Sequence, residues 1–272
     1  MSLATADFDY IRALVRKQSA IVLEPGKEYL VESRLSPLAR QLGTDTISGL
    51  VGRLRRGEPR LADKVVDAMT TNETSFYRDN HPFEALRHRV LPDLLEKRSA
   101  ERRITVWCGA SSSGQEPYTI AMVVMDLLAA RPGWSTSILA TDISEQMLFR
   151  TKEGRYSQLE VNRGLPVTML VKHFDKTGID WQVKPELRAM VQTRLLNLDQ
   201  PFPPIGTFDV VFLRNVLIYF DPPTKAAVLR KVRSVIKKDG YLFLGGAEST
   251  LTLDDAWERV VLDRATAYRL RG

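Results

Sequence analysis

The stretch WCGASSSGQEPYT, residues 107–119, decides the fold that we predict for this chain. It follows the apolar run ITV and leads into the apolar run IAMVVMDLL, which predicts a buried strand, a tight turn and a helix. Gly109 and Gly114 let this turn bend sharply and approach a ligand closely, because they carry no β-carbon. The stretch is not a GxGxxG sequence, which disfavours a dinucleotide and favours a ligand without a phosphate.

Short apolar runs and helical patterns continue to alternate after this stretch, as in SILATDIS, FDVVFLRN, TKAAVLRKVRSVIKK, GYLFLGG and TAYRL. Such alternation predicts an α/β fold with a parallel sheet covered by helices on both faces. Two segments depart from the pattern. Residues 81–97 predict an amphipathic helix that links two domains, and residues 174–183 predict a small hairpin inserted into the larger domain.

The N-terminal part of the chain has helical spacing and no strand alternation over residues 7–70. Breaks at Pro25-Gly26, Gly43 and Gly57 separate short helices. We therefore expect an all-helical domain over residues 1–75, a linker and helix over 76–98, and a sheet domain over 99–272. The small β-subdomain should occupy about residues 172–190.

Composition bounds the kind of protein. With 272 residues, 44% hydrophobic and 26% charged, the chain should fold throughout. Cys108 has no partner for a disulfide, and His81, His88 and His173 lack metal-ligand spacing, so we expect no metal. The N-terminus lacks a signal-peptide pattern and no window is long and apolar enough to span a bilayer, which favours a cytoplasmic protein without membrane insertion. No self-association signal is visible, so we expect a monomer.

The chain is basic, with a net charge of +6 and a sequence pI near 9.4. Such a charge is compatible with nucleic acid, an acidic membrane or an acidic protein face as the partner. Residues 34–60 carry six arginines against two acids. This cluster is either a solvated helix face or a surface that binds an acidic partner.

Polar residues follow the predicted strands at the points where they end. Asp142 closes the second strand, residues 197–199 close the third, and Arg214-Asn215 close the fourth. The carboxyl ends of parallel strands share one edge of a sheet, so these groups should form one site. Asp142 is placed to accept hydrogen bonds from both ribose hydroxyls of an adenosine compound, while Leu198 packs against the adenine face. The alternative for Asp142 is a cap on the helix over residues 144–150.

Five segments together resemble the chemotaxis receptor methyltransferase family, CheR: TTNETSFYRD (70–79), WCGASSSGQEPYTIAM (107–122), ATDIS (140–144), LLNL (195–198) and FLRNVLIYFD (212–221). The resemblance implies a Rossmann-like class I methyltransferase domain after a helical domain. It also implies methyl transfer from S-adenosylmethionine to glutamate side chains on the cytoplasmic helices of methyl-accepting chemotaxis receptors. The products are glutamyl methyl esters and S-adenosylhomocysteine.

The resemblance also implies roles for individual residues. With Gly109 of the turn, the cofactor-binding set is Asn72, Thr74, Arg78, Glu116, Asp142, Asn197, Leu198, Arg214 and Asn215. Arg78 and Tyr219 are the predicted catalytic residues. Once receptors are the expected partner, Arg34, Arg40 and Arg53 become candidates for a basic face that steers an acidic helix.

The implied chemistry requires little of the protein beyond positioning. A glutamate with a pKa of ~4.3 is already ionised at neutral pH, so no general base is needed. Arg78 suits a forked pair of hydrogen bonds to a carboxylate, and Tyr219 suits either an oxygen or the sulfonium. Apart from the segments that resemble the family, Arg78 would be interpreted as one half of a surface ion pair and Tyr219 as an aromatic residue of the hydrophobic core.

Other functions stay open at this point. A nucleic-acid methyltransferase would share the cofactor pocket and the high pI, but DPPT (221–224) has Thr224 where an amino-group methyltransferase has an aromatic residue, and its prolines suit a helix start. A cofactor-binding sensor or adaptor without catalysis is the second alternative. A dehydrogenase is disfavoured by the missing glycine fingerprint. In part of the family that this chain resembles, the β-subdomain docks on a tether peptide at the receptor C-terminus. The hairpin HFDKTGIDWQ (173–182) is short, which favours receptor recognition without such a tether.

Overall fold

The computed structural model describes residues 3–272, which divide into two compact units. The helical unit contains the chain up to Thr71 together with residues 219–224. The sheet unit contains residues 72–218 and 225–272.

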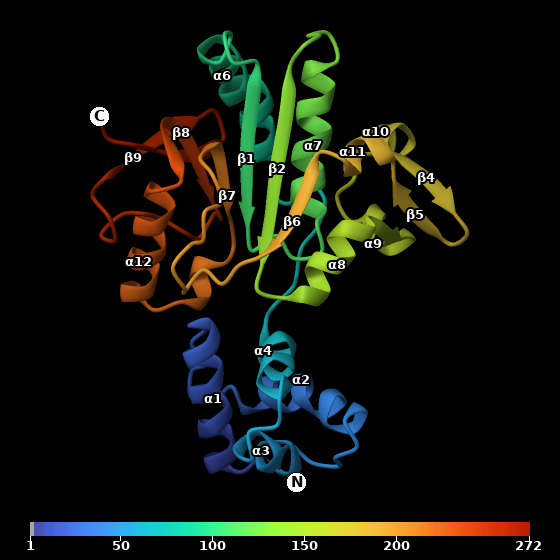
Figure 1. Ribbon diagram of the computed structural model, residues 1–272, viewed down its shortest axis with the longest axis vertical. Coiled ribbons are helices and arrows are strands. Elements are labelled where there is room, and N and C mark those ends of the chain that lie inside the picture. Colours follow the sequence, from blue (N-terminus) through green and yellow to red (C-terminus); the bar gives the residue numbers. More distant parts are fainter. Residues whose placement is uncertain (1–2) are drawn as a thin grey trace. The chain divides into compact units, whose positions relative to one another are not determined.

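The helical unit consists of α1 (Thr5–Ser19), α2 (Glu28–Gln41), α3 (Ile47–Arg55) and α4 (Leu61–Met69) (Figure 1). Turns at Pro25-Gly26, Gly43 and Gly57 separate these helices, as the sequence predicts. One apolar face of each helix supplies the unit's own core, which includes Ile11, Val31, Leu50 and Val65. The all-helical architecture is therefore confirmed.

The sheet unit has a seven-stranded sheet in the order β6-β2-β1-β7-β8-β10-β9. Its first four strands in space are β6 (Val191–Leu195), β2 (Ser135–Asp142), β1 (Arg103–Gly109) and β7 (Phe208–Leu213), and all neighbours among them are parallel (Figure 1). The four strand ends singled out in the sequence therefore lie along one edge of the sheet.

The sheet is mixed, whereas the sequence pattern predicts a parallel one. β8 (Ile236–Leu244) is parallel to β7, but β10 (Ala265–Leu270) is antiparallel to both β8 and β9 (Trp257–Leu262). Only Asp263 and Arg264 connect β9 to β10, and so short a connection permits only a hairpin. The helix predicted over residues 224–238 is also shorter, because Ile236 pairs with Phe208 and α12 (Pro222–Arg233) ends before it.

The segment predicted as a linking helix is part of the sheet unit's core. It comprises α5 (His81–Ala85), a π-helical turn η1 (Leu86–Val90) and α6 (Leu91–Lys97), with Phe83, Leu86 and Leu94 at most 1% exposed. The wider turn lies just before Pro92, whose ring leaves no N–H for a helical hydrogen bond. α7 (Gln115–Leu128) and α8 (Glu145–Glu153) supply further apolar side chains around the strands.

A second sheet has three strands in the order β3-β5-β4. The predicted hairpin is present as β4 (Phe174–Thr177) and β5 (Asp180–Val183), but β3 (Arg155–Ser157) pairs with β5 as well. The expected range of 172–190 therefore starts too late, because a three-residue strand leaves no alternation to read. Short helices α9 (Gln158–Asn162), α10 (Val167–His173) and α11 (Pro185–Arg188) complete this region.

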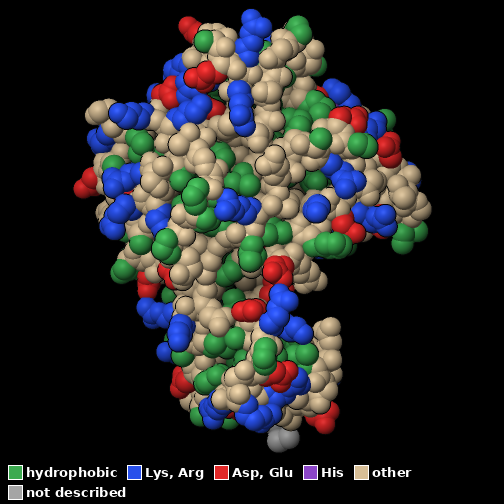
Figure 2. All heavy atoms as spheres, viewed as in Figure 1, with side chains coloured by type: hydrophobic (Ala, Val, Ile, Leu, Met, Phe, Trp, Pro, Cys, Tyr) green, Lys and Arg blue, Asp and Glu red, His purple; other side chains and the backbone are tan. Residues whose placement is uncertain are grey.

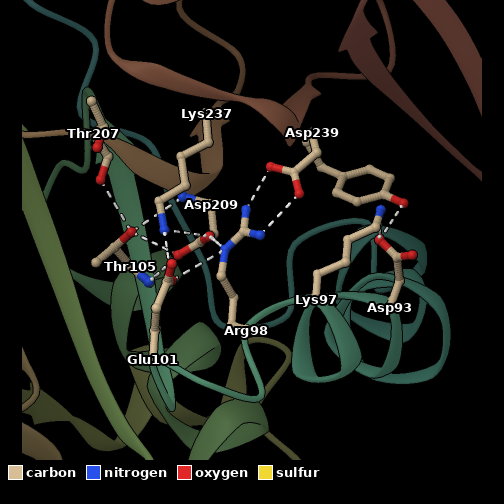
Figure 3. Close-up of polar contacts among 10 residues, drawn as sticks. Asp93, Lys97, Arg98, Glu101, Thr105, Thr207, Asp209, Lys237 and Asp239 are labelled. Atoms are coloured by element: carbon tan, nitrogen blue, oxygen red, sulfur yellow. Dashed lines mark hydrogen bonds and ion pairs between the residues drawn. The ribbon is translucent and has the colours of Figure 1, made fainter.

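A network of charges lies around Asp209, a carboxylate with no exposed surface (Figure 3). Arg98 Nε donates to Asp209 at 2.7 Å, while its two terminal nitrogens donate to Asp239. The backbone N–H of Thr105 donates to Asp209 at 2.8 Å, and Lys237 Nζ lies 2.9 Å away. Burial acts to raise the pKa of Asp209, but the hydrogen bonds from Thr105, Lys237 and Arg98 outweigh it and lower the pKa.

Removing Arg98 should strongly destabilise the sheet unit. We expect Arg98→Met to cost roughly 3–5 kcal/mol at pH 7, because one partner of a buried ion pair is lost. The pKa of Asp209 is lower in the folded than in the unfolded protein. The ionised carboxylate therefore stabilises the fold above the unfolded pKa, and this contribution is lost as the pH falls through the folded pKa. Urea unfolding followed by tryptophan fluorescence reports on this unit, which holds all four tryptophans.

Arg103→Met is the matched control, because Arg103 is exposed on β1. Its unfolding midpoint should match that of the unchanged protein. Equal midpoints for both variants at pH 7 would contradict the assigned role of Arg98.

Candidate active site

The loop between β1 and α7 is buried and has an unusual backbone. Ala110, Ser112 and Gly114 have φ values of 55°, 50° and 95°, and Ser111, Ser112 and Ser113 are at most 7% exposed. The Ser111 hydroxyl has no hydrogen-bond partner among residues 3–272. A buried hydroxyl without a partner fits a loop that receives part of its hydrogen bonding from a ligand.

The two glycines of this loop are required for packing within the chain. A β-carbon on Gly114 would lie 2.9 Å from the Thr151 side chain and from the Tyr156 hydroxyl. A β-carbon on Gly109 would lie 2.8 Å from Leu213 Cδ1. Neighbouring side chains therefore occupy the space that a β-carbon would need at either position.

Asp142 connects the loops that follow the first two strands. One carboxylate oxygen accepts a hydrogen bond from the Ser112 backbone at 2.8 Å, and the other accepts one from the Ser144 backbone at 2.9 Å. The cap of α8 is Ser144, whose hydroxyl accepts from Met147 N. The alternative of Asp142 as the helix cap is therefore wrong, and this carboxylate instead holds two loop backbones at the site.

Arg214 brings three of the predicted site residues together. Its side chain is 1% exposed, and it donates to Glu116 at 2.7 Å and to the carbonyl of Arg78 at 3.0 Å. It also donates to Asp79 at 2.7 Å, a residue that the sequence reasoning missed. Burial raises the pKa of Glu116, and the adjacent Arg214 opposes that rise.

The segment 72–79 is fixed to the loop after β1. The Ser112 hydroxyl donates to the carbonyl of Asn72 at 2.8 Å, and Thr74 in the same segment is half-buried. Arg78 Nη1 donates to the carbonyl of Glu73 at 3.0 Å. Among the described residues, this is the only hydrogen-bond acceptor of the Arg78 guanidinium.

Glu248 organises the end of β7, and the sequence reasoning missed it too. Its carboxylate accepts from the backbone N–H groups of Asn215 at 2.8 Å, Gly245 at 2.6 Å and Ile218 at 3.2 Å. Asn215 has a φ of 58°, a backbone conformation that asparagine tolerates better than most residues. The sequence does contain a pattern that indicates Glu248, because the polar segment GGAEST follows β8 at the end of a fifth strand.

The remaining cofactor candidates lie after β6. Asn197 Oδ1 accepts from the Asp199 backbone at 3.0 Å, and Leu198 is 7% exposed. The backbone N–H of Leu196 donates to the carbonyl of Asp142 at 2.9 Å, which joins this strand end to the next one.

The other predicted residues belong to the helical unit. Tyr219 is grouped there, and its carbonyl accepts from the Val22 backbone at 2.9 Å. Arg34 donates to the carbonyls of Met69 and Thr70, and burial lowers its pKa. Arg53 makes a forked contact with Glu58 and also donates to the carbonyl of Leu42. Arg40 is exposed.

The residues of the sheet unit fit S-adenosylmethionine. Asp142 and Glu116 provide acceptors for hydroxyl and ammonium groups, and the Ser111 hydroxyl is unsatisfied within the described chain.

No helix among residues 3–272 is long and apolar enough to cross a membrane.

Gly245→Ala should disrupt the end of β7. The new β-carbon would lie 2.7 Å from both Asn215 Nδ2 and Glu248 Oε2, so we expect a loss of ~1–3 kcal/mol of stability from overpacking. Affinity for S-adenosylhomocysteine, measured by calorimetry, should fall as well. Gly246→Ala is the control, because no atom lies within 4 Å of the position that its new β-carbon would take. Equal behaviour of the two variants would count against the packing argument.

Comparisons with known proteins cover nearly the whole chain. The model of the CheR methyltransferase all-alpha domain matches residues 6–70, and that of the CheR methyltransferase SAM binding domain matches residues 72–265. Chemotaxis protein methyltransferase 1 of Pseudomonas aeruginosa is 42% identical over 275 residues, covering 100% of both chains. Chemotaxis protein methyltransferase Cher2 of Pseudomonas putida is 39% identical with the same coverage. Chemotaxis protein methyltransferase 1 of Vibrio cholerae is 40% identical over 97% of this chain and 96% of its own. The chain therefore belongs to the CheR methyltransferase family, whose larger domain binds S-adenosylmethionine.

Proposed function

We propose that this protein methylates glutamate side chains on the helices of methyl-accepting chemotaxis receptors, forming glutamyl methyl esters. The cofactor, when bound, supplies a methyl group activated by its attachment to a sulfonium. The observation that carries the proposal is the guanidinium of Arg78, which is half-buried beside the cofactor candidates and has one hydrogen-bond acceptor among the described residues.

The two arginines at this edge of the sheet have different tasks. Arg214 is enclosed by Glu116, Asp79 and the Arg78 carbonyl, so its terminal nitrogens already have acceptors. Arg78 keeps most of its five N–H donors available, and a guanidinium presents them in the fork that matches a carboxylate. A substrate with a carboxylate at the reacting position is therefore favoured.

A carboxylate substrate also suits the rest of the site. The substrate oxygen is already ionised at neutral pH, so the chain needs to orient it but not to remove a proton. The opposite charges of the two reactants cancel as the new bond forms, and a water-excluding site favours that change. Arg78 would hold both oxygens of the carboxylate, which leaves positioning as its main contribution.

The helical unit supplies a candidate surface for an acidic helix. Lys and Arg side chains are prominent on the face of this unit visible in Figure 2, although acidic side chains lie among them. Since Arg34 and Arg53 serve internal contacts, exposed Arg40 is the best candidate of the three for steering a receptor.

The chemical test is the lability of the product. The protein should be incubated with labelled S-adenosylmethionine and a receptor cytoplasmic fragment, and the labelled receptor treated with alkali. A glutamyl ester releases volatile methanol, whereas a methylated nitrogen keeps its label. Alkali-stable label, or transfer to nucleic acid in place of receptor, would contradict the proposal.

Arg78→Met should lower kcat/KM for the receptor by about a hundredfold, because a charge-assisted fork to the substrate is lost. Arg78→Lys should recover part of this activity, since it keeps the charge without the fork. Arg131→Met, which removes an exposed arginine beyond the C-terminal end of α7, should behave as the unchanged protein. Full activity in Arg78→Met would exclude the assigned role.

Arg40→Glu should raise the KM for receptor severalfold and leave the affinity for S-adenosylhomocysteine unchanged, because a steering charge acts on encounter with the partner. The difference should shrink at high salt, where surface charges are screened. Arg131→Glu makes the same charge change on the other unit and serves as the control. An unchanged KM for Arg40→Glu would remove this residue from the receptor surface.

A further inference from the structure

Lys231, in the last turn of α12, directs its ammonium group at three consecutive backbone carbonyls. Nζ donates to the carbonyl of Leu198, to that of Asp199 at 2.8 Å and to that of Gln200 at 3.1 Å. An ammonium group has three N–H donors, and here each donor has one acceptor. One ammonium group therefore binds the carbonyls of three consecutive residues of this turn.

Two hydrogen bonds close the turn from within. Asn197 Oδ1 accepts from the Asp199 backbone at 3.0 Å, and the Asn197 carbonyl accepts from the Gln200 backbone at 3.1 Å. These two bonds close a four-residue turn but leave the three following carbonyl groups pointing to a common centre. Carbonyl dipoles directed at one point repel each other, so the turn requires a cation at that centre to keep this shape.

Neighbouring contacts fix both ends of the turn. At its start, the Leu196 backbone donates to the Asp142 carbonyl. Beyond its end, the Phe202 ring lies edge-on to buried Trp107 at 5.3 Å, and Lys231 Nζ lies 5.2 Å from the centre of the same ring. Burial lowers the pKa of Lys231, and nearby Asp199 opposes the change. Between these ends, Lys231 contacts the carbonyls of residues 198–200.

We propose that Lys231 is a positioning residue that shapes the turn 197–200 into the adenine-binding surface of the cofactor site. This inference rests on the proposed assignment of Asn197 and Leu198 to the cofactor. Lys231 acts through the backbone of the turn and does not touch the ligand. Removal of the Lys231 ammonium group should therefore weaken adenosyl binding and reduce the preference for adenine over other bases. The kcat at saturating cofactor should stay close to that of the unchanged protein.

The test compares two ligands and three variants by calorimetry. The ligands are S-adenosylhomocysteine and its analogue with hypoxanthine, in which an acceptor oxygen replaces the donor amine of adenine. The variants are Lys231→Met, Lys231→Arg and the control Arg230→Met, which removes an exposed charge from the adjacent position of α12. No receptor is needed, so the result is independent of the methyl acceptor.

Lys231→Met should bind S-adenosylhomocysteine about tenfold to a hundredfold more weakly, in line with the loss of hydrogen bonds to a charged group. Its preference for adenine over hypoxanthine should largely disappear. Lys231→Arg keeps the charge but cannot place three donors at one point, so it should be intermediate in affinity and in preference. Arg230→Met should match the unchanged protein.

Several results would overturn the inference. Unchanged affinity and preference in Lys231→Met would do so, and so would an equal loss for both ligands, which indicates only a structural role. If Lys231→Met fails to fold, the Lys231→Arg variant decides the question, and an unaltered preference for adenine in that variant would overturn the inference. Failure of the unchanged protein to bind either ligand would contradict the cofactor assignment itself, whereas failure to methylate receptor with binding intact would affect only the proposed acceptor.

Discussion

The parallel register of β6, β2, β1 and β7 is the constraint on which the site depends. Gly109 pairs with Thr141, and Asp142 pairs with Leu195, so three strands end within one residue of each other. Loops that start from such an edge are forced to share one space. Polar groups far apart in the chain then meet without any need for a long connecting loop.

Single side chains hold these loops in place by bonding to the backbone. Asp142 joins the loops after β1 and β2, Arg214 joins Glu116 to the segment 72–79, and Glu248 gathers three N–H groups. Asp142 and Arg214 are buried and Glu248 is partly buried, so each charge would be costly without partners, and each has several. Buried Asp209 also has several partners, but it lies away from the carboxyl ends of the strands and its role is structural. In this protein, buried charges at the strand ends shape the site, and the buried charge at Asp209 stabilises the fold.

Much of this could be predicted from the sequence, because the polar strand ends are local signals. The turn at 107–119, Asp142, residues 197–199 and Arg214-Asn215 could all be located from short patterns. The antiparallel β9 and β10 and the three-residue β3 could not, since their pairing depends on distant partners. Lys231 was missed for a related reason: in the pattern of α12 it looks like one more charge on a solvated helix face. Its carbonyl partners are more than thirty residues away, and only the fold brings them together.

The central claim is that the strand-end residues of the sheet unit surround an adenosyl ligand. A crystal structure of the protein with S-adenosylhomocysteine tests it most directly. We predict ribose hydroxyls about 2.5–3.0 Å from the carboxylate of Asp142, with the adenine against Leu198 and the amino acid end near Glu116. A ligand bound elsewhere, with no contact to the carboxylate of Asp142, would contradict it.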